Sequence, residues 1–274
     1  MDLPNDQVLD LPAPAMSLVS LAVLGDPVEH SLSPRMQNAA LRALGIEGEY
    51  VAVRAPADEF AECVAHLRDR GFVGANVTIP HKERAAGIGT ADDEIVSATG
   101  AANTLKFLSP VLCRNTDVPG FLRPIQSLAP GAALVLGGGG AAAAAVYALV
   151  LAGWGVRVWN RNPKNSIRLT QRFGCSFASD PDPSSCSLVV NATPLGLREG
   201  EMPELGWESA AAESVIYDLA YRDGPTDLLE HARSLGHRAI DGREMLVEQG
   251  ALSLEWWTGQ NVPRQVMREA VGLT

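Results

Sequence analysis

Short apolar runs alternate along the chain with longer segments in which apolar positions recur at helical spacing. In the first third of the chain this pattern predicts three strands separated by two helices, the first of which starts with a serine cap. The order is strand 17–25, helix 33–45, strand 49–55, helix 57–71 and strand 74–80. A β-α-β-α-β order predicts a mostly parallel sheet with right-handed crossovers.

The same alternation restarts at residues 132–161, where a strand, four glycines, an alanine-rich helix and another strand follow one another. Further strands are predicted at 186–194 and 211–221, a helix at 226–236 and a C-terminal helix at 245–259. We therefore predict an α/β fold with two α/β domains. The N-terminal one carries a mostly parallel sheet, the second is of the Rossmann dinucleotide-binding type, and a cleft is expected between them.

Composition narrows the class of protein. Hydrophobic residues make up 46% of the 274 residues, which excludes general disorder. The formal net charge of −10 argues against nucleic acid or an anionic membrane surface as partner. Residues 1–15 are acidic and rich in proline and lack the pattern of a signal peptide, so they predict a mobile tail. We expect a cytoplasmic protein without a membrane span.

The four cysteines are scattered and form no C-x-x-C pair: Cys63, Cys113, Cys175 and Cys186. This spacing predicts neither a disulfide scaffold nor a metal site and agrees with a reducing cytoplasm.

The glycine turn at residues 137–140 follows a predicted strand and precedes a predicted helix. Gly137, Gly139 and Ala142 match the pattern G-x-G-x-x-A, which lets a pyrophosphate approach the backbone at a helix N-terminus. The alternative is an Ala/Gly-rich junction kept only for close packing. The strand–turn–helix context favours dinucleotide binding.

The end of the next predicted strand bears on the choice of cofactor. An NAD site usually places Asp or Glu there, but this chain has Asn160 and Arg161, with Lys164 close behind. An arginine at this point suits a 2′-phosphate, which favours NADP. The alternative is an arginine that is simply solvated at a strand end.

Nine short motifs, taken in order, resemble those of the shikimate dehydrogenase family, and together they cover about residues 18–259. They are HSLSP (30–34), NVTIPHKE (76–83), GAANTL (100–105), NTDVPGF (115–121), LGGGGAA (136–142), NR (160–161), NATPLG (191–196), DLAY (218–221) and MLVEQGAL followed by WTG. The resemblance implies reversible, NADPH-dependent reduction of 3-dehydroshikimate to shikimate, a step of the shikimate pathway to aromatic amino acids.

The resemblance also implies that Lys82 and Asp117 form the catalytic pair. Of the 22 lysines and arginines only three are lysines, Lys82, Lys106 and Lys164. Hydride addition to a ketone builds negative charge on oxygen, so a proton donor is needed there, and lysine can transfer a proton whereas arginine cannot. The alternative for Lys82 is a solvated strand-end lysine.

The remaining site residues follow from the same resemblance. The substrate is expected to contact Ser31, Ser33, Thr78, Lys82, Asn103, Asp117, Tyr221 and Gln249. NADP is expected to contact Gly137, Gly139, Gly140, Asn160, Arg161, Lys164, Thr193, Gly242 and Met245. Ser33 could instead cap its helix. His30, His81, Glu29 and Glu83 are interpreted as non-catalytic.

Four positions depart from the family pattern: Ala143 stands where arginine is common, Asn162 where threonine is usual, Cys113 where glycine is common, and Arg243 where an apolar residue is usual. The first two leave open a quinate/shikimate dehydrogenase that uses NAD. A non-catalytic nucleotide-sensing protein on the same fold is disfavoured by the presence of Lys82 and Asp117. A short-chain dehydrogenase is disfavoured because no Tyr-x-x-x-Lys occurs.

The family role of Gln249 implies that the chain returns to the first domain. We therefore predict a substrate-binding domain of residues 1–122 plus 241–274 and an NADP-binding domain of residues 123–240. A monomer or homodimer is expected, with a small-molecule substrate as its only implied partner.

Overall fold

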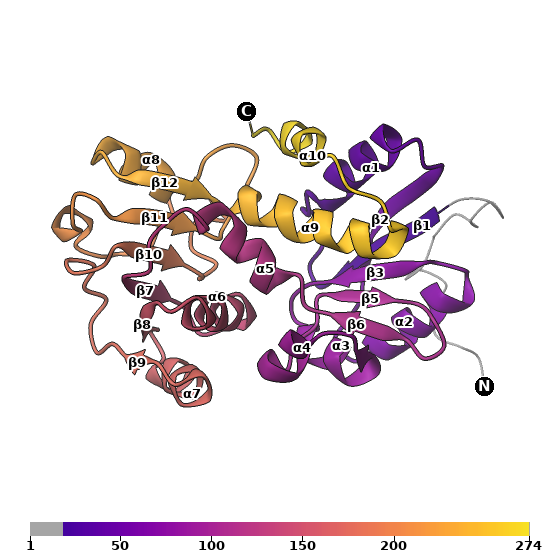
Figure 1. Ribbon diagram of the computed structural model, residues 1–274, viewed down its shortest axis with the longest axis horizontal. Coiled ribbons are helices and arrows are strands. Elements are labelled where there is room, and N and C mark those ends of the chain that lie inside the picture. The colour runs from indigo at the N-terminus through magenta and orange to yellow at the C-terminus, as the bar shows by residue number, and fades with distance from the viewer. Residues whose placement is uncertain (1–18, 274) are drawn as a thin grey trace. The chain divides into compact units, whose positions relative to one another are not determined.

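The computed structural model describes residues 19–273, which form two compact α/β units. The first, called unit 1, contains the described residues up to Thr116 together with Gly250–Ala270. The second, unit 2, contains Asp117–Gln249 and the residues that follow Ala270. Each unit is built on a six-stranded sheet (Figure 1).

The sheet of unit 1 has the order β2-β1-β3-β5-β6-β4. Strand β1 pairs in parallel with β2 and β3, whereas β5 is antiparallel to both β3 and β6. The elements are β1 (Val19–Gly25), α1 (Ser33–Ala43), β2 (Gly48–Arg54), α2 (Phe60–Asp69), β3 (Gly74–Val77), α3 (Lys82–Ile88), β4 (Thr90–Ala91), α4 (Glu94–Thr99), β5 (Thr104–Lys106), β6 (Leu112–Arg114) and α10 (Arg264–Ala270).

The sheet of unit 2 is entirely parallel, in the order β12-β11-β10-β7-β8-β9. In Figure 1 these strands follow one another from β12 near the top to β9 near the bottom. The elements are α5 (Asp117–Leu122), η1 (Arg123–Ile125), β7 (Ala132–Leu136), α6 (Gly140–Leu151), β8 (Gly155–Trp159), α7 (Pro163–Phe173), β9 (Ser176–Phe177), β10 (Leu188–Asn191), η2 (Trp207–Ser209), β11 (Val215–Asp218), α8 (Asp227–Ser234), β12 (Arg238–Asp241) and α9 (Gly242–Thr258). Helix α9 continues from unit 2 into unit 1 at Gly250.

This strand order is that of a Rossmann fold, with the first strand of the unit, β7, at the point where the connections reverse direction. Strands β10 and β11 are buried along their whole length, as expected for central strands of a parallel sheet covered on both faces. Small side chains in α6, among them Ala145 and Ala148, are fully buried and let the helix approach the sheet closely.

The predicted fold class, two α/β domains of which one is Rossmann-type, is confirmed. The prediction for residues 74–80 was too long, because β3 ends at Val77 and a turn follows it. The serine cap of the first helix was also wrong: α1 starts at Ser33, its N-cap is Leu32, and Pro34 lies within its first two positions. The predicted tail of residues 1–15 lies outside the described residues.

The two compact units begin and end at other residues than the substrate-binding and NADP-binding domains that the sequence predicts. Helix α5 packs against α6, and Phe121 stacks on Tyr217 with ring centroids 5.1 Å apart. A Cβ placed on Gly120 would lie 2.7 Å from the Cβ of Gln249. These contacts group residues 117–122 and 241–249 with unit 2. The division of binding roles between the two parts of the chain therefore stays a prediction.

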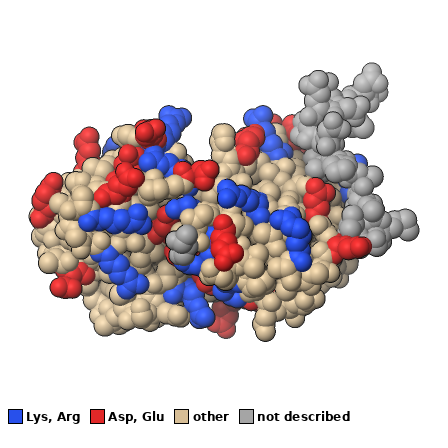
Figure 2. Space-filling model, turned by 90° about the horizontal axis from the view of Figure 1, so that it is seen from above, with Lys and Arg blue, Asp and Glu red and all other residues tan. Residues whose placement is uncertain are grey.

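Charged side chains are mixed on the surface. Figure 2 shows acidic and basic residues interspersed over one face of the molecule.

Among the described residues all four cysteines are free thiols, and three of them are buried. Cys113, which had no explanation from the sequence, packs in the core of unit 1, where burial raises the pKa of its thiol to about 11.

Candidate active site

In unit 1 the predicted substrate residues gather at one edge of the sheet. The loop with Ser31 follows β1, and Thr78 follows β3, which is parallel to β1. Asn103 immediately precedes β5, which runs antiparallel to β3. Carboxyl ends of parallel strands and the amino end of an antiparallel neighbour meet at the same edge. The topology therefore brings these three positions together, as the resemblance implies.

Lys82 is the first residue of α3 and is partly buried. Its backbone carbonyl accepts a hydrogen bond from the amide of Ala102 at 2.9 Å, which ties the start of α3 to the segment that carries Asn103. The preceding amide, that of His81, donates to the carbonyl of Thr78 at 2.9 Å. Lys82 is thus held beside two of the predicted substrate residues.

His81 is fully buried beside the core of unit 1. Its ring stacks on Phe60 with centroids 4.4 Å apart, and its Nε2 lies 2.6 Å from the carbonyl oxygen of Ala55. Since a carbonyl only accepts, Nε2 must carry the proton in this contact. The geometry supports the interpretation of His81 as a structural residue.

Ser31 lies on the loop between β1 and α1, and Ser33 is the first residue of α1. The Ser31 hydroxyl oxygen accepts from the amide of Ser33 at 3.2 Å. Ser33 is 6% exposed, and it lies inside the helix rather than at the N-cap, so the capping alternative for its side chain loses its basis.

Asn103 is held by the segment that leads to Asp117. Its Oδ1 accepts from the amide of Thr116 at 2.7 Å, and its Nδ2 donates to the Thr116 hydroxyl at 2.9 Å. Asn76, which the sequence analysis did not single out, donates from Nδ2 to the Asn103 carbonyl at 3.1 Å and to the Ser253 hydroxyl at 2.9 Å. A buried polar network therefore supports this part of the site.

The other predicted substrate residues belong to unit 2. Asp117 starts α5 and is 5% exposed. Burial, followed by the negative charge of Asp117, raises the pKa of the Tyr221 hydroxyl to about 12. Gln249 lies on α9 against α5, with its Nε2 donating to the carbonyl of Leu246 at 2.9 Å.

The glycine turn connects β7 to α6 at the carboxyl edge of the parallel sheet. Gly137 has a φ of +132°, and a Cβ there would lie 2.7 Å from the carbonyl oxygen of Ala192, so both backbone and space require glycine. At Gly139, the N-cap of α6, a Cβ would meet no atom of the described chain within 4 Å, and no side chain caps the helix. The open room beside uncapped N–H groups fits a pyrophosphate.

The predicted phosphate-binding residues follow β8, the next strand. Arg161 and Lys164 are exposed, and Asn162 caps α7 by accepting from the amide of Lys164 at 3.2 Å. Asn160 donates from Nδ2 to the carbonyl of Asn162 at 3.0 Å. Arg161 and Lys164 are thus exposed at this corner, and Ala143 adds no further cation there.

Thr193 follows β10 and is positioned by Asn191. The Thr193 amide and hydroxyl both donate to Oδ1 of Asn191, at 3.0 and 2.6 Å. Asn191 in turn donates from Nδ2 to the carboxylate of Asp218 at 2.7 Å and to the carbonyl of Leu195 at 2.8 Å. The loop that carries Thr193 is therefore anchored to the end of the neighbouring strand β11.

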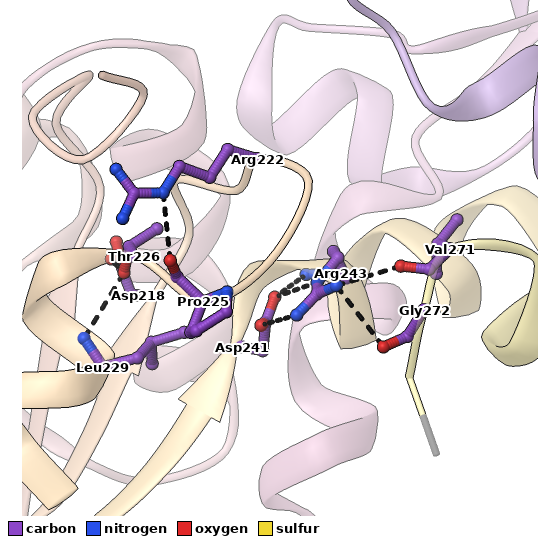
Figure 3. Close-up of polar contacts among 9 residues, drawn as sticks. All are labelled: Asp218, Arg222, Pro225, Thr226, Leu229, Asp241, Arg243, Val271 and Gly272. Carbon is purple, nitrogen blue, oxygen red and sulfur yellow. Dashed lines mark hydrogen bonds and ion pairs between the residues drawn. The ribbon is translucent and has the colours of Figure 1, made fainter. Parts of the chain in front are cut away.

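Asp218 is fully buried at the centre of this arrangement. Its carboxylate accepts from the Thr226 hydroxyl at 2.5 Å (Figure 3). It also accepts from the amide of Ala220 at 3.1 Å. Burial raises the pKa of this carboxyl to about 6; the hydrogen bonds of Thr226, Asn191 and Ala220 lower it, and the charge of Asp241 raises it. Sequence reasoning included Asp218 only as part of DLAY and gave it no role.

We expect Asp218→Asn to remove a pH-dependent loss of stability. Because the folded state raises the pKa from 3.8 to about 6, it binds the proton more tightly than the unfolded chain. Wild-type stability should therefore fall relative to the variant as pH rises from about 4 to about 6, by roughly 3 kcal/mol. Chemical denaturation across this window measures the difference, with Asp180→Asn, an exposed aspartate, as control. A difference that does not change with pH would contradict the prediction.

Gly242 and Met245 lie at the start of α9, next to the end of β12. A Cβ on Gly242 would lie 2.7 to 2.9 Å from the carbonyl oxygens of Leu219, Asp218 and Ala220, so only glycine fits. All the predicted cofactor residues thus lie at or just beyond the carboxyl edge of the unit 2 sheet, where dinucleotides bind in this fold.

A glycine turn at the switch point of a Rossmann-ordered sheet, in a chain with a second α/β unit rich in polar residues at one edge, is typical of dinucleotide-dependent dehydrogenases. Comparison with known proteins makes the class specific. Residues 23–105 match the family model described as the shikimate dehydrogenase substrate binding domain, and residues 242–271 match the shikimate 5'-dehydrogenase C-terminal domain.

A shikimate dehydrogenase (NADP(+)) from Methanothrix thermoacetophila is 40% identical over 258 residues, which cover 91% of this chain and 95% of that protein. The shikimate 5-dehydrogenase of Thermus thermophilus, solved in complex with NADP(H) and shikimate, is 37% identical with a TM-score of 0.86, covering 93% of this chain and 98% of that one. A shikimate dehydrogenase from Aquifex aeolicus has a TM-score of 0.89 at 32% identity, covering 94% and 99%. The chain belongs to the shikimate dehydrogenase family.

Within residues 19–273 no helix is long and apolar enough to cross a membrane. In the same part of the chain no group of three or more His, Cys, Asp or Glu side chains is arranged to hold a metal ion.

Proposed function

We propose that this protein catalyses the reversible, NADPH-dependent reduction of 3-dehydroshikimate to shikimate, as a cytoplasmic monomer or homodimer. Membership of the shikimate dehydrogenase family carries the proposal. Two structural observations support it: the polar cluster at the edge of the unit 1 sheet, and the glycine turn at the switch point of unit 2.

NADPH, when bound, supplies the hydride that adds to the ketone carbon. Lys82, as an ammonium, donates a proton to the carbonyl oxygen as negative charge develops there, and the product is the alcohol; in the reverse direction the amine accepts that proton. Asp117 orients Lys82 and accepts a hydrogen bond from a substrate hydroxyl. The position of Lys82, tied to Ala102 and next to Asn103, supports this role.

The polar residues around Lys82 select the substrate. Ser31 and Ser33 bind the carboxylate with Tyr221 near it, while Thr78, Asn103 and Gln249 bind hydroxyl groups. A buried set of such groups rejects an analogue that lacks one hydroxyl, because a site group then loses its partner. Most of these side chains are buried or partly buried, which supports selection of this kind.

In the proposed division of roles, residues 1–122 plus 241–274 bind the substrate and residues 123–240 bind NADP. Gly137, Gly139 and Gly140 hold the pyrophosphate, Asn160, Arg161 and Lys164 the adenosine end, and Thr193, Gly242 and Met245 the nicotinamide half. A quinate/shikimate dehydrogenase that uses NAD is the second candidate, favoured by Ala143 and by Asn162, whose side chain is engaged in capping α7.

A steady-state assay that crosses shikimate and quinate with NADP and NAD tests the proposal. We expect the highest kcat/KM for shikimate with NADP. Higher kcat/KM for quinate with NAD would replace the proposal with the second candidate, and NADP binding without turnover of either substrate would favour a nucleotide-sensing protein.

We expect Arg161→Ala to raise KM for NADP at least tenfold more than KM for NAD. A hydrogen bond to a charged phosphate contributes roughly 1.5–3 kcal/mol, and roughly 1.4 kcal/mol corresponds to a factor of ten. The matched control is Arg168→Ala, which removes an exposed arginine that lies on α7 rather than at the end of β8. Equal losses with both cofactors would show that Arg161 does not bind the 2′-phosphate.

A further inference from the structure

Arg243, which departs from the family pattern, is buried at the junction of β12 and α9. Its guanidinium contacts the carboxylate of Asp241 through two nitrogens, Nε to Oδ1 at 3.0 Å and Nη2 to Oδ2 at 2.6 Å (Figure 3). Its backbone amide also donates to Oδ1 of Asp241 at 2.9 Å. Both residues are 6% exposed. The ion pair therefore closes a tight ring around the backbone of Gly242.

The same guanidinium holds the last residues of the described chain. Its Nη1 donates to the carbonyl of Val271 at 3.0 Å and approaches the carbonyl of Gly272 at 3.5 Å. Val271 is 1% exposed. The Asp241 carboxylate binds Nε and Nη2 of Arg243, and the carbonyls of the segment after α10 accept from Nη1.

Gly242, enclosed by this ring, packs directly on the segment that leads to Tyr221. A Cβ on Gly242 would collide with three consecutive carbonyl oxygens of residues 218–220. Movement of the corner of residues 241–243 would therefore shift both this segment and the first turn of α9, where Met245 lies.

A buried ion pair is weak evidence for stability, because its desolvation cost offsets much of the attraction. The two parallel hydrogen bonds between the guanidinium and the carboxylate, together with the bond from the Arg243 amide, do favour a single geometry for residues 241–243.

We propose that Arg243 is a positioning residue: with Asp241 and the carbonyls of Val271 and Gly272, it holds Gly242 and Met245 where the nicotinamide end of NADPH must lie. The inference rests on the proposed function and deepens it. It makes the C-terminal residues 271 and 272 part of the machinery that orients the hydride donor. Small misplacements at a reacting centre lower the rate steeply, whereas anchors at the far end of the cofactor preserve its affinity.

The test compares Arg243→Leu, Arg243→Lys and a chain that ends at Ala270 with the wild-type protein and with Arg238→Leu, a matched control on the exposed side of β12. For Arg243→Leu and the shortened chain we expect kcat with shikimate to fall at least about tenfold, while the Kd for NADPH stays within about threefold. Arg243→Lys, which can still meet Asp241, should lie between. Arg238→Leu should resemble wild type.

Two readouts separate positioning from a purely structural role. Using shikimate deuterated at the oxidised carbon, we expect a larger primary isotope effect in Arg243→Leu, because hydride transfer becomes limiting. The fluorescence of bound NADPH should change in intensity or wavelength, because the nicotinamide lies in altered surroundings. A lower melting temperature with kcat per folded molecule, isotope effect and fluorescence all unchanged would overturn the proposal.

The fluorescence comparison does not depend on turnover. A wild-type protein that binds NADPH but does not oxidise shikimate would overturn the proposed function alone, and unchanged fluorescence in the variants would overturn the positioning role alone. A wild-type protein that does not bind NADPH would overturn both. If Arg243→Leu fails to fold, Arg243→Lys and the shortened chain decide by the same criteria.

Discussion

Replacement of Lys82 with arginine is expected to lower kcat nearly as much as replacement with alanine, by about 10²–10⁴-fold. Arginine keeps the positive charge and could still stabilise an oxyanion. Its pKa lies above about 12, so it is a poor proton donor and cannot act as a base in the reverse direction. Turnover should therefore fall in both directions, while substrate binding is partly preserved.

The measurement is kcat for both variants at saturating substrate and cofactor, with folding checked by thermal melting. Lys106→Arg is the matched control, because Lys106 donates to the carbonyl of Trp256 at 2.8 Å and has no part in the proposed chemistry. A Lys82→Arg enzyme within a few-fold of wild type would show that Lys82 supplies only charge.

Asn76→Ala is expected to destabilise unit 1 by roughly 3 kcal/mol or more, the largest stability effect that we expect from a single polar residue of this protein. The Asn76 side chain accepts from the Tyr50 hydroxyl at 2.8 Å and lies within 3.1 Å of three further partners. Alanine would remove these four hydrogen bonds from the buried network at once, and each contributes roughly 1 kcal/mol.

Chemical denaturation of wild type and Asn76→Ala gives the difference in the free energy of unfolding. Tyr50→Phe is the control, since it removes one hydroxyl from the same network and should cost only about 1 kcal/mol. We also expect a lower kcat/KM for Asn76→Ala below its unfolding transition, because Asn76 supports the backbone of Asn103. A loss of stability no larger than that of Tyr50→Phe would contradict this interpretation of the network.

Most elements that the sequence predicted have a local pattern that extends over many residues, although helix α7, with eleven residues, was missed. Strand β7 and helix α6 are both apolar throughout, and the run of glycines between them marks where one ends and the other begins. The β5–β6 pair was missed because each strand has three residues and carries polar ones, such as Thr104 and Arg114. Helix α3, with seven residues, is also too short to show a helical period.

The candidate site divides in the same way. Residues that would touch ligands lie in short contiguous motifs, so Lys82, Asn103 and Thr193 could be assigned from sequence. Residues that hold them in place depend on partners far along the chain: Asn76 and Ser253 are 177 positions apart, and Arg243 and Val271 are 28 apart. No local pattern records such pairs, because folding alone brings them together.

The glycines of the turn at residues 137–140 differ in whether the folded chain itself requires them. At Gly137 and Gly138 a side chain would collide with the protein itself, so these glycines say nothing about a ligand. At Gly139 a side chain would have room, and serine at this N-cap would suit α6 better than glycine does. Selection for stability alone would therefore drive this position away from glycine. A glycine at this position instead agrees with the proposed approach of a pyrophosphate to the helix N-terminus.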